Sequence, residues 1–321
     1  MMKIQENISL KNYTTFNVGG NARYFCICKN IDDLHNAIEF SKNNKIEYFI
    51  LAGGSNLIVS DDGYNELIIK TEFNKLEFRD LKIIVGSGYI IDKLVNIANR
   101  KGLKGLEWAG GLPGTVGGAV RGNAGAFGGE VKDCVLKVKS QKSKIKDIEI
   151  IERNNQQCEF GYRTSIFKHN KEIILEVELK MQKGDLYELI KIADDHRQYR
   201  QDKHPIEFGC AGSTFKNYPV NFATYEVKQG FSDVIKTDPF PVIPTAAIID
   251  RAGLKGYTIG DAQISEKHPN YIINLGNAKA KDIISLIEYV IKKVKDVYNI
   301  DLEVEPQLLG FNKKYDWESI V

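Results

Sequence analysis

The part of the sequence best suited to chemistry is a glycine-rich stretch at residues 110–130, GGLPGTVGGAVRGNAGAFGGE. Nine of the 20 residues from 110 through 129 are glycine. Glycine has no Cβ and permits positive φ, so clustered backbone N–H groups can approach an anion such as phosphate. Each interior helical glycine costs about 1 kcal/mol relative to alanine, which argues against a helix here. A flexible linker is the alternative, but linkers are polar, whereas Leu112, Val116 and Phe127 are spaced as if packed, which favours a structured phosphate- or cofactor-binding loop.

A second glycine segment occurs earlier in the chain. A short apolar strand expected at residues 46–51 runs into Ala52-Gly53-Gly54-Ser55-Asn56, and Leu57-Ile58-Val59 follows. Glycine between two strands marks a place where the backbone approaches a ligand closely. Two such segments suit a long diphosphate cofactor better than a single phosphate. They predict a flavin or dinucleotide held by backbone groups.

Several other cofactor and catalytic classes lack their motifs. Gly86-Ser87-Gly88 is followed by Tyr89-Ile90-Ile91, so no GxGxxG fingerprint joins a strand to a helix. The sequence has no GxxxxGK[ST] phosphate loop and no GxSxG elbow. Cys26 and Cys28 are separated by one residue, which is too few for a usual zinc pair. No metal site is predicted.

Composition describes an ordinary globular protein. The 321 residues allow two or three domains, and 44 Lys+Arg against 42 Asp+Glu leave a net charge of +2. Neither nucleic acid nor a membrane is therefore an expected partner. The first 16 residues lack the apolar core of a signal peptide. An odd set of five cysteines favours reduced thiols and a cytoplasmic location.

The expected elements follow an α+β order. Periodicity predicts helices at residues 31–44 with Asn30 as N-cap, and at 90–101, 185–200, 246–252 and 279–298. Strands are expected at residues 46–51, 57–59, 67–70, 81–85, 131–139, 145–152, 173–181, 271–274 and 302–309. Composition changes near His204-Pro205, where a second domain of about a hundred residues is expected to begin.

Five motifs occur in an order that resembles one enzyme family. ILAGGSN, GLPGTVGGAVRGNAGAFGGE, YRTS, AGSTFKN and LEVEPQLLG are similar to the motifs of UDP-N-acetylenolpyruvoylglucosamine reductases. The resemblance extends from Tyr13 to Gly310, and the chain looks like the shorter subclass because it lacks the extra substrate-covering insertion. The glycine-rich motif alone resembles the broader superfamily of FAD proteins of the PCMH/VAO type.

The resemblance implies an α+β fold with a two-part FAD-binding domain and a C-terminal α+β substrate-binding domain. The two FAD-binding parts are expected at residues 1–72 and 73–204, with residues 302–321 returning to the second part. Residues 205–301 are expected to cover the substrate.

The resemblance also implies the chemistry. Non-covalently bound FAD would be reduced by NADPH and would pass hydride to UDP-N-acetylglucosamine enolpyruvate. The product, UDP-N-acetylmuramate, is a peptidoglycan precursor, which connects the activity to cell wall biogenesis, cell shape and cell division. Hydride addition at carbon 3 of the enolpyruvyl ether leaves an enolate that must be stabilised and then protonated at carbon 2. The expected partners are thus a UDP-sugar substrate and NADPH.

Three positions match the catalytic residues of that family. Arg163 in GYRTS matches the arginine that contacts the substrate carboxylate and the developing enolate, for which a guanidinium fork is well suited. Ser213 in AGSTFKN matches the proton donor, although serine is a poor acid and depends on position. Glu305 in LEVEPQ matches the glutamate opposite the arginine. Residue type alone allows other readings: Arg163 could form a surface ion pair, Ser213 could be a turn or helix-capping serine, and Glu305 could be a solvated carboxylate. Glu303 would share the strand face of Glu305.

The remaining matches concern binding and two departures. The expected cofactor-binding residues are Gly53, Gly54, Ser55, Asn56, Gly110, Gly114, Thr115, Gly117, Gly118, Asn123, Ala124 and Gly125. The expected substrate-binding residues are Arg200, Lys203, Lys216, Asn217 and Lys255. Proline usually follows FKN in the family, but this chain has Tyr218 before Pro219, and Arg121 occupies a position that is normally more apolar.

Two other functions remain open at this stage. The first is an FAD-dependent oxidase or dehydrogenase that acts on a small hydroxy acid with the same fold. The second is a non-catalytic flavin- or nucleotide-binding protein. Loss of turnover with retained flavin reduction in a Ser213→Ala variant would distinguish the reductase from both.

Overall fold

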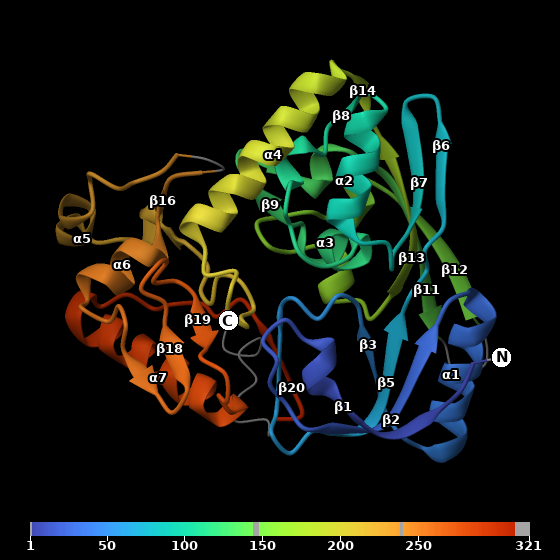
Figure 1. The fold of residues 1–321 in the computed structure, drawn as a ribbon, viewed down its shortest axis with the longest axis horizontal. Coiled ribbons are helices and arrows are strands. Elements are labelled where there is room, and N and C mark those ends of the chain that lie inside the picture. Colours follow the sequence, from blue (N-terminus) through green and yellow to red (C-terminus); the bar gives the residue numbers. More distant parts are fainter. Residues whose placement is uncertain (1, 144–147, 238–239, 312–321) are drawn as a thin grey trace. The chain divides into compact units, whose positions relative to one another are not determined.

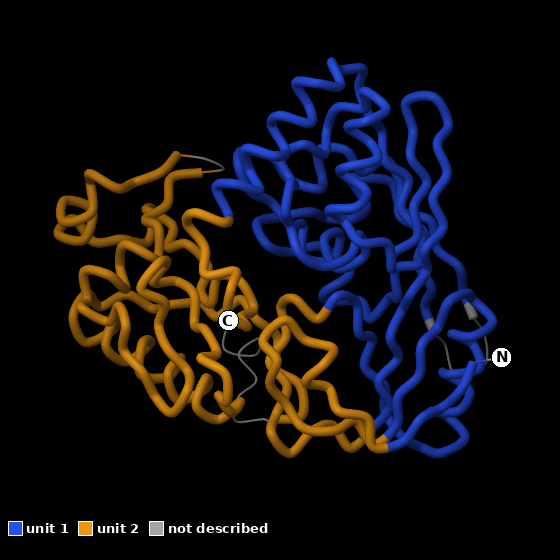
Figure 2. Tube along the Cα trace, viewed as in Figure 1, with its two compact units in different colours: residues 1–6, 24–53, 66–200 blue, residues 7–23, 54–65, 201–321 orange. Residues whose placement is uncertain are grey.

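The computed structural model describes residues 2–143, 148–237 and 240–311. The chain divides into two compact units (Figure 2). Unit 1 contains Met1–Glu6, Tyr24–Gly53 and Glu66–Arg200, and unit 2 contains Asn7–Arg23, Gly54–Asn65 and Gln201–Val321.

Unit 1 is built on a five-stranded antiparallel sheet of order β12-β11-β13-β7-β6 (Figure 1). Its strands are β6 (Leu76–Arg79), β7 (Lys82–Gly86), β11 (Val135–Ser143), β12 (Ile148–Asn154) and β13 (Ile173–Lys180). Three helices accompany this sheet, namely α2 (Ile91–Arg100), α3 (Val116–Gly122) and α4 (Leu186–Lys203). Two short pairs complete the region, β8 (Leu103–Lys104) with β14 (Gln182–Lys183) and β9 (Gly125–Ala126) with β10 (Gly129–Glu130).

The core of this region draws on both the sheet and the helices. Val85, Leu94, Val120, Val177 and Ala193 belong to one cluster of buried side chains. Burial of such aliphatic groups stabilises a fold by about 25 cal/mol per Å² of apolar surface. The sheet and the three helices therefore form one packed body around the glycine-rich stretch.

A smaller sheet with the order β1-β2-β5-β3 precedes it in the chain. Its strands are β1 (Gln5–Ser9), β2 (Asn21–Cys28), β5 (Tyr64–Thr71) and β3 (Tyr48–Leu51), and β3 runs parallel to β5. Helix α1 (Ile31–Asn44) connects β2 to β3 and buries Leu34, Ala37 and Ile38 against the strands. Asn30 caps α1, because its side chain accepts a hydrogen bond from the Asp33 N–H at 2.8 Å.

Unit 2 contains a three-stranded sheet and three helices. The strands are β17 (Thr258–Ile259), β18 (Ala262–Ile264) and β19 (Ile272–Asn274), and the helices are α5 (Tyr225–Gly230), α6 (Thr245–Arg251) and α7 (Ala280–Tyr298). Two further pairs are β4 (Leu57–Val59) with β20 (Gln307–Leu309), which is parallel, and β15 (Tyr218–Pro219) with β16 (Val242–Ile243). The apolar face of α7 enters the core of this unit through side chains such as Ile283, Ile287 and Val290.

Six 3-10 helices complete the secondary structure of the described residues. They lie at Leu10–Tyr13, Glu107–Ala109, Val131–Asp133, Gln156–Cys158, Ile166–Lys168 and Val220–Phe222. None of the helices within residues 2–143, 148–237 and 240–311 combines the length and the apolar character needed to cross a bilayer.

Most predicted elements are confirmed, and three expectations need correction. The helices expected at 31–44, 90–101, 185–200, 246–252 and 279–298 are present within three residues of the expected ends. The strand expected from residue 131 begins at Val135, because Val131–Asp133 forms a 3-10 turn closed by a reciprocal capping box. The strand expected at 302–309 is limited to Gln307–Leu309, since Pro306 has no N–H for a ladder. Of the strand expected at 145–152, residues 145–147 lie outside the described residues, as do residues 312–321 of the expected C-terminal return.

The third correction concerns the glycine-rich stretch, where the argument against a helix is wrong for Val116–Gly122. Helix α3 forms despite three glycines because both of its ends are capped. The Thr115 side chain accepts from the Gly118 N–H at 3.5 Å, and Asn123 ends the helix in the left-handed conformation with φ 42°. Val116, Ala119 and Val120 are buried, so tertiary packing compensates for the low helix propensity of glycine.

Candidate active site

In unit 1 the two glycine segments meet. A Cβ placed on Gly53 would lie 2.6 Å from Gly114 Cα and 3.2 Å from the backbone nitrogen of Thr115. Real Cβ atoms do not approach other atoms this closely, so Gly53 has no space for a side chain. Gly53 and Gly114 are therefore in direct backbone contact.

Several glycines of the stretch are required by the protein's own packing. A Cβ on Gly110 would overlap the backbone of Ala193 in α4, and one on Gly129 would overlap the ring of Trp108. A Cβ on Gly117 would lie 2.7 Å from the Cβ of Ser87. These positions explain why the stretch is ordered rather than a linker.

Gly118 is different, because no protein atom is close enough to exclude a side chain there. It is exposed, and a Cβ there would only make ordinary contacts of 3.7 Å with Ala52 and Thr115. A glycine inside a helix without a steric reason is destabilising by roughly 1 kcal/mol. The protein's own packing therefore does not account for a glycine at position 118.

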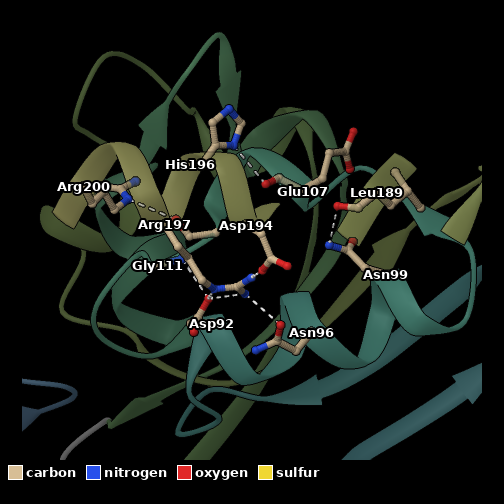
Figure 3. Close-up of polar contacts among 11 residues, drawn as sticks. Asp92, Asn96, Asn99, Glu107, Gly111, Leu189, Asp194, His196, Arg197 and Arg200 are labelled. Atoms are coloured by element: carbon tan, nitrogen blue, oxygen red, sulfur yellow. Dashed lines mark hydrogen bonds and ion pairs between the residues drawn. The ribbon is translucent and has the colours of Figure 1, made fainter. Parts of the chain in front are cut away.

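Helices α2 and α4 fix the start of the stretch (Figure 3). Asp92 Oδ1 of α2 accepts from the Gly111 N–H at 2.8 Å and from Arg197 Nη2 of α4 at 2.7 Å. Arg200 Nε donates to the Gly110 carbonyl at 3.0 Å. Gly111 has φ 72°, a conformation that favours glycine. The Asp92 carboxylate and Arg200 thus hold both polar atoms of the peptide unit between Gly110 and Gly111, and Arg197 in turn holds the carboxylate.

Arg163 lies in a tight turn of unit 1. Gly161 and Thr164 exchange backbone hydrogen bonds of 3.0 and 3.3 Å around it, and Arg163 itself has φ 57°. Its Nη2 donates to the carbonyl of Gly125 at 2.9 Å. A non-glycine residue in the left-handed region is uncommon and is often found at functional sites. The guanidinium is thereby oriented against the end of the glycine-rich stretch.

Asn123 connects the same two segments. Its side chain is fully buried and donates to the Gly161 carbonyl at 2.9 Å, while its Oδ1 accepts from the Lys132 N–H at 3.1 Å. These bonds use both polar ends of the carboxamide. Any contact of Asn123 with a cofactor would therefore come from its backbone, as would contacts of the neighbouring Ala124.

In unit 2 the structure brings Ser213 and Glu305 into adjacent segments. The Thr214 carbonyl accepts from the Glu305 N–H at 2.9 Å, and the Lys216 N–H donates to the Glu303 carbonyl at 2.9 Å. Ser213 begins no helix, since it lies in an irregular segment between α4 and β15. The helix-capping alternative for this serine is therefore excluded.

Asn56, in the glycine segment at residues 53–56, is hydrogen-bonded to the segment that carries Glu305. Its Nδ2 donates to the Glu305 carbonyl at 3.1 Å, and its own carbonyl accepts from the Gln307 N–H at 3.0 Å. Within unit 2, a residue expected to contact the cofactor is thus bonded directly to the segment that carries Glu305. Gly54 precedes it with φ 65°, and a Cβ there would overlap the Tyr13 carbonyl.

The two glutamates of LEVEPQ have different surroundings. Glu303 is exposed, and its carboxylate forms an ion pair with the ammonium group of Lys216. Glu305 is half-buried. The two side chains therefore have distinct environments.

The expected substrate-binding residues are distributed over both units. Arg200 lies in unit 1, with its guanidinium 5.1 Å from the centre of the Phe127 ring. Lys203, the last residue of α4, and Lys255, in the turn after α6, are exposed in unit 2. Asn217 Oδ1 accepts from the Thr245 N–H at 3.2 Å, so its side chain also supports the start of α6.

The two departures from the family pattern have local explanations. Tyr218 forms β15, where it pairs with Ile243, and its hydroxyl donates to the Phe222 carbonyl at 3.1 Å. Arg121 lies in the last turn of α3, and its carbonyl accepts from the Ser165 hydroxyl at 2.7 Å. Neither departure disturbs the glycine contacts described above.

One group near the cofactor region was not anticipated from the sequence. Lys70 Nζ, at the end of β5, donates to the Ala52 carbonyl at 3.2 Å, immediately before Gly53. Burial lowers the pKa of Lys70, while the nearby Glu72 acts in the opposite direction. A charged residue at the end of an apolar strand gives no sign of such a contact in the sequence.

Comparison with known protein families first identifies the class of protein to which the chain belongs. Residues 22–142 match the family model of an FAD-binding domain, and residues 204–309 match that of the C-terminal domain of UDP-N-acetylenolpyruvoylglucosamine reductase. The fold therefore defines an FAD-binding oxidoreductase with an α+β substrate domain, as predicted.

Full-length relatives then define the family. The chain is 37% identical over 303 residues to the UDP-N-acetylenolpyruvoylglucosamine reductase of Alkaliphilus oremlandii, which covers 94% of this chain and 91% of that relative. It is 36% identical over 310 residues to that of Anoxybacillus flavithermus, with 96% and 94% coverage. The crystal structure of the Thermus caldophilus enzyme superposes with a TM-score of 0.75 at 32% identity, over 96% of this chain and 100% of that one. The chain belongs to the UDP-N-acetylenolpyruvoylglucosamine reductase family.

Proposed function

We propose that this chain reduces UDP-N-acetylglucosamine enolpyruvate to UDP-N-acetylmuramate with NADPH as hydride donor. The observation that carries the proposal is the identity of 36–37% with reductases of this name over 94–96% of the chain. It favours the reductase over a hydroxy-acid oxidase and over a non-catalytic flavin protein. The reaction belongs to peptidoglycan precursor synthesis, and with it we propose a cytoplasmic location.

The backbone of the two glycine segments would hold FAD. The groups proposed to do so are Gly53, Gly54, Ser55, Asn56, Gly110, Gly114, Thr115, Gly117, Gly118, Asn123, Ala124 and Gly125. The exposed surface of Gly118 supports this assignment most directly, because the protein itself does not explain that glycine. When bound, FAD supplies a two-electron carrier between NADPH and carbon 3 of the enolpyruvyl group.

Three side chains of this protein would then manage charge and protons on the substrate. The Arg163 guanidinium offers parallel charged hydrogen bonds to the carboxylate and to the enolate that develops from it. Ser213 Oγ gives its proton to carbon 2, for which a fixed position compensates a weak acid. Glu305, bonded through its backbone to the Ser213 segment, completes the acid–base group.

The remaining proposal concerns binding and domain roles. Arg200, Lys203, Lys216, Asn217 and Lys255 would bind the anionic diphosphate and carboxylate of the UDP-sugar. Residues 1–72 and 73–204 would form the two FAD-binding parts, with residues 302–321 returning to the second, and residues 205–301 would form the substrate domain.

A half-reaction experiment tests the proposal. The purified flavoprotein is reduced anaerobically with NADPH, or with NADH in a parallel sample, while the flavin absorbance near 450 nm is followed. The enolpyruvyl UDP-sugar is then added, and we expect rapid return of the oxidised spectrum with formation of UDP-N-acetylmuramate. Reduced flavin that is not reoxidised by this substrate would refute the function. Bleaching of the oxidised protein by lactate or glycolate would instead support the hydroxy-acid oxidase.

A further inference from the structure

The segment that carries Ser213 is held along both of its edges in unit 2. On one edge, the Thr214 carbonyl accepts from the Glu305 N–H at 2.9 Å. On the other edge, the Thr214 N–H donates to the Asn270 carbonyl at 2.7 Å, and the Thr214 hydroxyl oxygen accepts from the Ile272 N–H at 3.3 Å. Thr214 is 3% exposed. The residue next to Ser213 is thus a buried bridge between Glu305 and Asn270.

The side chain of Asn270 extends this bridge by one residue. Its Oδ1 accepts from the Phe215 N–H at 3.0 Å, and its Nδ2 donates to the Phe215 carbonyl at 2.8 Å. Asn270 is 3% exposed and Phe215 is 1% exposed, so water does not replace these bonds. The carboxamide satisfies a buried N–H and a buried C=O at once, as a neighbouring strand would do. Leaving either group unsatisfied costs about 1–3 kcal/mol.

Asn270 is itself held in a fixed turn. The Ser265 hydroxyl oxygen accepts from the Lys267 N–H at 3.1 Å and from the His268 N–H at 3.3 Å, and the His268 carbonyl accepts from the Tyr271 N–H at 2.9 Å. Strand β19 begins directly afterwards at Ile272. The carboxamide therefore extends from rigid backbone and can transmit a defined position to the segment that it holds.

We propose that Asn270 is a positioning residue that sets the location of Ser213 relative to Glu305. The inference rests on the proposed function, because it takes Ser213 as the proton donor to carbon 2 of the substrate. A hydroxyl is a poor acid, so its contribution depends on its distance from the acceptor carbon more than on its pKa. A misplacement of about 1 Å can reduce a rate by about 10²-fold. Reduction of the flavin by NADPH does not require this proton.

Asn270→Asp tests the inference, because the replacement has the same shape but loses the donor to the Phe215 carbonyl. Until carbon 2 is protonated, the hydride can return from carbon 3 to the flavin, so we expect net reoxidation of the NADPH-reduced flavin by the enolpyruvyl UDP-sugar to slow by about 10–100-fold. Reduction by NADPH should stay within about twofold of the original rate. The solvent deuterium isotope effect on turnover should rise, because proton delivery becomes slower than hydride transfer.

The pH profile provides a second readout, measured over the pH range in which the variant remains folded. A buried carboxyl has a raised pKa and can be protonated at mildly acid pH. The protonated side chain can again donate to the Phe215 carbonyl and accept from the Phe215 N–H. The activity of Asn270→Asp relative to the unmodified enzyme should therefore increase as the pH is lowered.

Asn274→Asp is the matched control. Asn274 is also a buried carboxamide of unit 2, 6% exposed, but its Nδ2 donates to the Phe16 carbonyl at 3.1 Å and its Oδ1 accepts from the Gly276 and Ala278 N–H groups. It should lose stability without a selective effect on reoxidation. If Asn270→Asp does not fold, Asn270→Ser keeps the backbone bond to Thr214 and should show the same selective loss.

The outcomes separate the inference from the function on which it rests. Failure of the unmodified enzyme to be reoxidised by the enolpyruvyl sugar would refute the proposed function. Normal reoxidation by that enzyme and by the Asn270 variants would refute the positioning role alone. Equal slowing of both half-reactions in the Asn270 variants, or the same selective loss in Asn274→Asp, would also refute it.

Discussion

Substitution of Gly118 by alanine tests whether a bound ligand or the packing of the protein requires a glycine at this position. In the protein alone, a Cβ at this position makes only ordinary contacts at 3.7 Å. Helix α3 should then gain up to about 1 kcal/mol from the better helix former. A cofactor lying on the Gly118 backbone would instead collide with the new methyl group. The apoprotein should therefore become more stable while FAD binding becomes weaker.

The two effects can be separated by their size. FAD at one hundred times its dissociation constant stabilises the protein by about 2.7 kcal/mol, and a tenfold weaker affinity reduces this value to about 1.4 kcal/mol. Gly118→Ala should thus raise the free energy of unfolding of the apoprotein by up to about 1 kcal/mol and reduce the FAD-dependent increment by about 1.3 kcal/mol. The holoprotein should show almost no net change.

Apoprotein prepared by removal of flavin is titrated with FAD by fluorescence quenching and unfolded in urea with and without FAD. Gly122→Ala is one control, because a Cβ there meets nothing within 4 Å and the position was not assigned to the cofactor. Gly117→Ala is the opposite control, since a Cβ 2.7 Å from the Ser87 Cβ should destabilise the apoprotein by about 1–3 kcal/mol. Unchanged FAD affinity in Gly118→Ala would refute the proposal that FAD lies on the Gly118 backbone. A less stable apoprotein would refute the inference that the protein has space for a Cβ at this position.

Three further substitutions test other parts of the site. Glu305→Gln should reduce turnover by about 10²–10⁴-fold while flavin reduction by NADPH persists. Glu303→Gln should instead cost less than about 1 kcal/mol of stability, because its ion pair with Lys216 is exposed. Equal losses of turnover in both variants would contradict the assignment of Glu305 as the catalytic glutamate. Lys70→Met should weaken FAD binding by about tenfold by releasing the Ala52 carbonyl, and a titration that gives the original affinity would contradict it. Burial lowers the pKa of His268 below its usual value of 6.5, so the unfolded chain takes up the proton first and stability falls as the pH drops below 6.5. Urea unfolding at two pH values should show a smaller loss of stability in acid for His268→Gln, and the same loss as in the unmodified protein would refute this.

The sequence was sufficient for the long periodic elements. Helix α1 and its cap at Asn30 were predicted to the residue, and α7 differs from its prediction only in that Lys279 precedes the first helical residue. Their apolar faces repeat with a helical period over many residues, so local sequence and tertiary packing favour the same state.

Local sequence failed where tertiary contacts dominate. Glycine content argued against helix α3, whose stability depends on buried neighbours and two capping residues. Strand β2 (Asn21–Cys28) was not anticipated, because its first half follows a turn sequence and its burial depends on a partner strand more than 40 residues later. Propensity carries no information on such long-range packing.

The same limit applies to the candidate site. Glycine at positions 53 and 114 indicated close backbone approach, and the two positions do touch. The segments of Ser213 and Glu305 lie far apart in sequence, and neither residue type by itself suggests catalysis. Their hydrogen-bonded neighbourhood in unit 2 was implied only through family resemblance. Nothing in the sequence indicated a role for Asn270, because a buried asparagine that bonds to backbone cannot be distinguished in sequence from any polar turn residue.

The glycine-rich stretch therefore contains glycines that the packing of the protein requires and glycines that are proposed to contact the cofactor. Gly110 and Gly129 allow α4 and Trp108 to pack directly on the backbone, which makes the stretch rigid. That rigidity extends to Arg163, which is proposed to be catalytic, since the Gly125 carbonyl accepts from Arg163 Nη2 and a Cβ on Gly125 would lie 2.7 Å from Glu130 Cγ. A substitution at Gly125 would consequently disturb the arginine even if the cofactor still bound. The backbone that is proposed to hold the flavin in unit 1 also orients the charge proposed to stabilise the enolate, while the serine proposed as proton donor is held by contacts within unit 2.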